Sequence, residues 1–105
     1  MITEIVYKGY DNVINLLLKK NGVAQDLSGV TKMELLLGDV MISSDNQDSD
    51  PIRWAKDGYS TGEVRLYLGP ENIELDDYEA SLTVFDEFYV DGLVWGKVKI
   101  YVRDR

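Results

Sequence analysis

The chain contains no cysteine and no histidine among its 105 residues. Without cysteine, neither disulfide bonds nor thiolate metal ligands can form. Without histidine, the chain lacks the commonest general base and the commonest metal ligand, and no serine or cysteine can be activated by an imidazole. We therefore expect a protein that is not an enzyme and that uses neither a cofactor nor a catalytic metal.

Long apolar runs are also missing. No segment approaches the 18 consecutive apolar residues that a membrane-spanning helix would need. The start of the chain, Met1 to Val6, has neither a basic region nor a long apolar stretch, so it is not typical of a signal peptide. We expect synthesis in the cytoplasm and no membrane contact.

Positive charge is scarce, because 11 lysines and arginines face 19 acidic residues and give a net charge of −8. Lys19 and Lys20 are adjacent, and Lys97 and Lys99 share a predicted strand face, but no larger basic cluster occurs. A phosphate backbone would be repelled by this charge, so we expect no nucleic-acid partner.

Short segments with a period of two residues are abundant instead. The clearest is Leu93 to Val102, which places Val94, Val98, Ile100 and Val102 on one face and Trp95, Lys97, Lys99 and Tyr101 on the other. Such alternation predicts a strand with one face in a core. Further strands are predicted at residues 2–8, 13–20, 30–37, 52–55, 62–68 and 78–84.

Turn signals separate these segments. Asn21-Gly22 suits a type I′ hairpin turn, and Pro70 suits the start of a single helical turn ending at Ile73. About seven strands and no long helical period predict one all-β domain over residues 1–105, a two-layer antiparallel sandwich of the immunoglobulin-like or Greek-key kind. A small barrel is the alternative. Tyr78, after Asp76-Asp77, is typical of the tyrosine corner of such sandwiches.

The segment from Ser43 to Asp50 contains no apolar residue, which predicts a mobile surface loop. Its carboxylates Asp45, Asp48 and Asp50, with Asp39 nearby, offer oxygen ligands for a cation. Their spacing does not match an EF-hand loop, and a solvated loop is the preferred interpretation.

Three large aromatic residues are predicted to point outward from strands: Trp95, Tyr101 and Tyr67. They could stabilise an exposed sheet through cross-strand pairs, form a protein interface whose register Lys97 and Lys99 set, or offer a flat platform for a sugar. These three interpretations remain open at this point.

Four groups of residues together resemble a recurrent bacteriophage module: Asp11–Lys20 with Asn21-Gly22 and Asp26-Leu27-Ser28-Gly29-Val30, then Gly62-Glu63-Val64, Tyr78-Glu79-Ala80 and Gly96–Val102. In this order of turns and strands the chain is similar to the N-terminal domain of phage baseplate upper proteins and related small tail-associated sandwiches.

The resemblance implies a virion structural protein of the tail or baseplate, made in the host bacterial cytoplasm. It implies assembly through protein–protein contacts, with other phage structural proteins or further copies of itself as partners. Trp95, Tyr101, Tyr67, Lys97 and Lys99 would form the contact. The alternative function is a carbohydrate-binding or adhesin-like sandwich.

Overall fold

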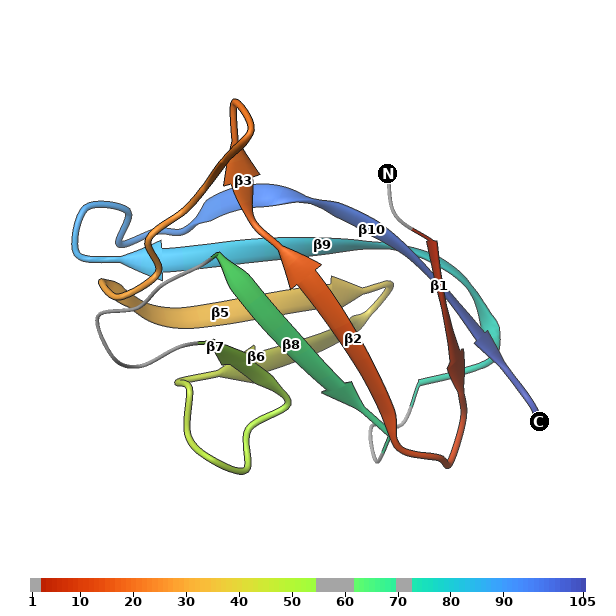
Figure 1. Ribbon diagram of the computed structural model, residues 1–105. Coiled ribbons are helices and arrows are strands. Elements are labelled where there is room, and N and C mark those ends of the chain that lie inside the picture. Colours follow the sequence, from red (N-terminus) through yellow and green to blue (C-terminus); the bar gives the residue numbers. More distant parts are fainter. Residues whose placement is uncertain (1–2, 55–61, 70–72) are drawn as a thin grey trace.

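The computed structural model describes residues 3–54, 62–69 and 73–105 (Figure 1). In this part of the chain there is no helix, and the secondary structure consists of strands. These are β1 (Thr3–Tyr7), β2 (Asn12–Leu17), β3 (Lys19–Lys20), β4 (Val23–Ala24), β5 (Val30–Leu37), β6 (Val40–Ser44), β7 (Ile52–Trp54), β8 (Glu63–Leu68), β9 (Asp76–Asp86) and β10 (Leu93–Arg103). The expectation of an all-β chain is confirmed.

Two sheets carry most of the structure. The larger has the order β1-β10-β9-β5-β6, and the smaller has the order β2-β8-β7. Neighbouring strands are antiparallel except for β1, which runs parallel to β10. The smaller sheet crosses over one face of the larger (Figure 1), an arrangement consistent with a β-sandwich.

The core lies between the two sheets and takes alternate residues from both. Met33 and Leu35 of β5 and Ile100 of β10 meet Val64 and Leu66 of β8, and all five are fully buried. Burying a side chain of this kind stabilises the folded state by about 1.5–3 kcal/mol relative to leaving it exposed. The predicted alternation therefore identifies the core faces of these strands.

The turn predicted at Asn21-Gly22 is confirmed. Both residues have positive φ, 54° and 79°, as a type I′ turn requires. The hairpin involves only β3 and β4, because the predicted strand 13–20 divides at Leu18, whose N–H bonds the carbonyl of Gly62. The resulting ribbon projects from the body of the molecule (Figure 1). The predicted helical turn from Pro70 lies largely outside the described residues.

The tyrosine corner is confirmed. The hydroxyl of Tyr78, at the start of β9, donates a hydrogen bond of 2.9 Å to the carbonyl of Glu74, four residues earlier. The ring packs against the core and comes so close to Gly38 that a Cβ there would lie 3.1 Å from it. The tyrosine thus joins the start of β9 to the turn between β5 and β6.

The prediction of a featureless mobile loop over Ser43 to Asp50 is wrong in its first half. Ser43 and Ser44 end β6, and Ser44 and Asn46 are buried. These two residues are polar although they are buried, because their side chains form hydrogen bonds inside the protein. Asn46 adopts φ +63°, a left-handed conformation that asparagine tolerates better than most residues.

Two asparagine side chains form hydrogen bonds between the sheets, at two places that we call seams: one between β6 and β7, and one between β1 and β2. At one seam the amide of Asn46 accepts a hydrogen bond from the N–H of Trp54 and donates one to its carbonyl, both 3.0 Å, while Ser44 Oγ donates to the carbonyl of Ile52. At the other, the amide of Asn12 accepts from the N–H of Tyr7 and donates to its carbonyl, again at 3.0 Å, and donates to the carbonyl of Leu68. Side chains thus replace ladder hydrogen bonds where the sheets separate.

Candidate functional site

The five residues predicted to form one contact surface do not lie together. Lys97, Lys99 and Tyr101 lie on the outer face of β10 in the five-stranded sheet, whereas Tyr67 lies on β8 in the other sheet. Because the two sheets present their outer faces in opposite directions, Tyr67 cannot share a flat contact with Tyr101. The prediction that all five residues share one surface is therefore wrong, and contact of any of them with a partner stays a prediction.

Trp95 is also placed differently from the prediction. A β-bulge between Val94 and Gly96 inserts one extra residue in β10 opposite β9. One inserted residue reverses the alternation on one side of the bulge. Val94, predicted to point inward, is exposed, while Trp95, predicted to point outward, is half-buried and packs against the core.

The outer face of β10 is dominated by ion pairs. Lys97 pairs with Glu79 across the strand at 3.7 Å, and Arg103 pairs with Asp77 at 2.5 Å. The guanidinium of Arg103 also lies over the ring of Tyr101, 5.1 Å from its centroid. Exposed pairs of this kind contribute little stability, so this face resembles an ordinary solvated sheet surface.

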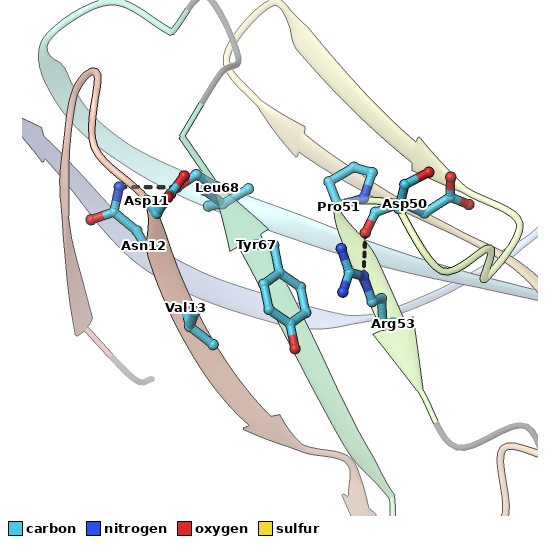
Figure 2. Close-up of a pocket in the computed structure, with 9 residues that line it drawn as sticks. Asp11, Asn12, Val13, Asp50, Pro51, Arg53, Tyr67 and Leu68 are labelled. Atoms are coloured by element: carbon cyan, nitrogen blue, oxygen red, sulfur yellow. Dashed lines mark hydrogen bonds between the residues drawn. The ribbon is translucent and has the colours of Figure 1, made fainter.

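A cleft of about 480 Å³ surrounds Tyr67 (Figure 2). Its described lining comes from the start of β2, the end of β8, and the segment that leads into β7: Asp11, Asn12, Val13, Ser49, Asp50, Pro51, Arg53, Tyr67 and Leu68. The Arg53 guanidinium lies 4.0 Å from the centroid of the Tyr67 ring, a cation–π distance. Arg53 Nε also donates to the carbonyl of Asp50 at 2.8 Å, which holds the guanidinium in place.

The carboxylate of Asp50 organises the loop beside this cleft. Its Oδ2 accepts hydrogen bonds from the N–H groups of Gln47 and Asp45, at 3.0 and 2.9 Å, and lies 3.1 Å from the Ser44 hydroxyl, whose single proton it shares with the carbonyl of Ile52. The N–H of Gln47 is the main cause that lowers the pKa of Asp50 below its usual value. Asp50 therefore acts as a structural acceptor within its own loop.

This geometry bears on the sugar interpretation. Arg53 covers one face of the Tyr67 ring, and Trp54 is buried in the core. An aromatic ring stacks on a sugar through a free face, so the buried Trp54 offers no platform, and at Tyr67 a sugar could use only the face that Arg53 leaves open. The cleft is lined by apolar and polar groups together, and none of its described side chains is a buried polar group without a partner.

A third region was not singled out from the sequence: the hairpin tip, defined here as residues 86–94 between β9 and β10. Phe88 and Val90 are 82% and 73% exposed, and Tyr89 and Val94 are exposed as well. Large apolar side chains gathered on one projecting loop are a recognised sign of an interaction site. The signal in the sequence was the run Phe88-Tyr89-Val90 inside a predicted turn.

The hairpin tip is held by its own hydrogen bonds. Asp86 Oδ1 accepts from the N–H groups of Phe88 and Tyr89, at 2.9 and 2.7 Å, and the N–H of Gly92 bonds the carbonyl of Tyr89 at 3.1 Å. Gly92 has φ +90°, and a Cβ there would lie 2.7 Å from side-chain atoms of Thr83 and Phe85. The tip therefore presents its apolar side chains on a defined backbone.

Among residues 3–54, 62–69 and 73–105, no three acidic side chains converge in a way that could hold a metal ion. The same residues include no helix of the length and apolarity required to cross a bilayer.

No family model matches this sequence, and neither the curated proteins nor the solved structures yielded a match.

Proposed function

We propose that this chain is a non-enzymatic assembly module that binds another protein through its hairpin tip. The observation that carries the proposal is the exposure of Phe88, Tyr89 and Val90 on a loop whose backbone is held by Asp86. Aromatic residues supply a disproportionate share of contact energy in protein interfaces. A loop that is already ordered loses less conformational entropy on binding than a flexible one.

The charges around the tip define the partner. Asp86, Glu87 and Asp91 flank the apolar residues along the chain. We therefore expect a protein surface with an apolar pocket and a rim of lysine or arginine, because opposite charges at a rim favour encounter and orientation. The same carboxylates would be repelled by an anionic bilayer.

The resemblance to tail-associated phage modules supplies the setting that we propose: a virion, with another tail or baseplate protein as the partner. We also propose that the sandwich is immunoglobulin-like. Two features support this class. One is the packing of a five-stranded sheet against a three-stranded sheet with these strand orders, and the other is the tyrosine corner of Tyr78 at the start of β9.

Photo-crosslinking tests the proposal. The protein carrying p-benzoylphenylalanine in place of Phe88 is irradiated in cells of its native background, and adducts are separated by mass. We expect one discrete protein adduct, which a second substitution, Val90→Asp, abolishes while the circular dichroism spectrum is unchanged. The matched control carries the same photoreactive residue in place of Met41, which is half-exposed on β6 in the five-stranded sheet.

Two results would count against the tip as the contact. One is the absence of a protein adduct at position 88. The other is the same set of adducts from position 41, since that would indicate random collisions.

A further inference from the structure

The edge strands of the two large sheets differ in how their backbone groups are satisfied. These edges are β1, β6, β2 and β7. After β1, the N–H of Lys8 bonds the carbonyl of Arg103 on the neighbouring strand, so the backbone groups of Tyr7 point to the open edge. There the side-chain amide of Asn12 bonds both the N–H and the carbonyl of Tyr7. On β7, the amide of Asn46 does the same for Trp54. At the last residue of each of these two strands, a side chain therefore occupies the backbone groups that another strand would need.

Strand β2 has no such protection in the part of the chain that the structure describes. The N–H of Leu18 bonds the carbonyl of Gly62, so the backbone groups of even-numbered residues of β2 point to β8. The N–H of Tyr67 bonds the carbonyl of Pro51, so odd-numbered residues of β8 point to β7 and its even-numbered residues to β2, which agrees. Backbone groups alternate in direction along a strand. The N–H and carbonyl groups of Val13, Asn15 and Leu17 therefore point to the open edge, and no described side chain bonds them.

The same strand lacks the features that normally guard an edge. Between Asn12 and Leu17 it has no proline, no charged residue and no bulge. Its outward side chains Val13 and Leu17 are 56% and 50% exposed, with Asn15 between them. On a protein with a net charge of −8, this is an uncharged apolar edge.

The strand is complementary to itself in one antiparallel register. With Asn15 opposite Asn15 of a second copy, Val13 lies opposite Leu17 of that copy, and Leu17 opposite its Val13. All three outward-facing residues then fall in hydrogen-bonded pairs, each of which exchanges two N–H···O bonds. The two amides of Asn15 meet on the twofold axis.

The charges just beyond the strand agree with this register. It places Asp11 of one copy opposite Lys19 of the other, twice by symmetry, and both side chains are solvent-exposed. Any contact between two copies has to overcome the repulsion of two molecules that each carry a net charge of −8. In this contact, opposite charges meet at both ends of an uncharged strand.

We propose that β2 is a homodimerisation edge, which pairs with β2 of a second copy and joins the two three-stranded sheets into one. A twofold contact of this kind is isologous and closed, so it yields a dimer and not a filament. The contact does not involve the hairpin tip, so either proposal can fail while the other holds.

A charge-exchange experiment tests the register. Asn15→Lys and Asn15→Asp each place two like charges on the twofold axis, whereas a mixture of the two variants places a lysine opposite an aspartate. We expect a concentration-dependent dimer of the wild-type protein by light scattering and sedimentation. Each variant alone should raise the dimer dissociation constant about tenfold or more, and the mixture should restore a one-to-one heterodimer.

Asn15 is exposed and has no hydrogen bond to a described residue, so both variants should keep the wild-type circular dichroism spectrum. Met41→Lys, on the five-stranded sheet, is the matched control and should dimerise like the wild type. Wild-type protein that stays monomeric at millimolar concentration would overturn the proposal. So would variants that dimerise unchanged, or a mixture of the two that forms no heterodimer.

Discussion

Replacement of Asn46 tests whether the polar seam between β6 and β7 stabilises the fold. Asn46→Gly removes the amide and keeps a backbone that accepts φ +63° without strain. Asn46→Ala removes the same amide but keeps a Cβ in the left-handed region, which alanine tolerates less well than asparagine or glycine. Comparison of the two variants separates the hydrogen bonds from the backbone conformation.

The magnitude follows from the two hydrogen bonds to Trp54. Without the amide, the N–H and the carbonyl of Trp54 lose their partners, and an unpaired buried polar group costs about 1–3 kcal/mol. We expect the free energy of unfolding to fall by about 2–4 kcal/mol in Asn46→Gly. Asn46→Ala should lose about 1 kcal/mol more, because a left-handed residue with a Cβ is strained.

Urea denaturation followed by circular dichroism measures both changes. A slope of about 2 kcal/mol per molar urea, the middle of the range for small proteins, converts the loss in Asn46→Gly to a midpoint lowered by about 1–2 M. Asn15→Ala, at an exposed asparagine of β2, is the control and should stay within about 0.5 kcal/mol of the wild type. If Asn46→Gly also stays within that margin, the seam does not stabilise the fold and the reasoning fails.

Two further predictions concern how stability changes with pH, at Asp50 and at Tyr78, and a third concerns the stability of an Asp50 variant at pH 7. Because the folded pKa of Asp50 lies below its unfolded value near 3.8, the stabilisation that this carboxylate contributes is present above that value and is lost as the pH falls through the folded pKa. Chemical denaturation at pH 7 and pH 3 should therefore show a smaller loss of unfolding free energy on acidification for Asp50→Asn than for the wild type. Asp50→Asn should also be the less stable protein at pH 7, and equal stability there would contradict the role of the carboxylate. Burial, followed by the nearby carboxylate of Asp76, raises the pKa of Tyr78 above 10, so its contribution is present below pH 10 and is lost as the pH rises further. Tyr78→Phe should therefore lose stability less steeply than the wild type in alkaline melting curves, with Tyr101→Phe as the control for removal of a phenol.

Local patterns predicted much of this architecture. Alternation along residues 30–37, 62–68 and 78–84 identified strands and their core faces, because a half-buried strand imposes a period of two on its side chains. Asn21-Gly22 identified a type I′ turn, since few other dipeptides adopt positive φ twice. The position of Tyr78 identified the corner whose hydrogen bond to Glu74 the structure contains.

Other features depended on partners far away in the sequence. In the sequence Ser44 and Asn46 are typical of loop residues. In the fold they lie beside Ile52 and Trp54, and their side chains form the hydrogen bonds that a neighbouring strand would otherwise make. The bulge between Val94 and Gly96 exists only relative to β9, so no pattern within β10 could reveal that Trp95 packs inward.

The same distinction applies to the candidate surfaces. Period and turn chemistry are properties of neighbours along the chain, and they identified the aromatic side chains of Tyr67 and Tyr101 as outward. Which sheet each strand joins, and therefore that these two tyrosines face opposite ways, is set by pairing across the fold. Strand β2 likewise has an open edge because it pairs with β8 on one side only, and that pairing is decided by the tertiary structure.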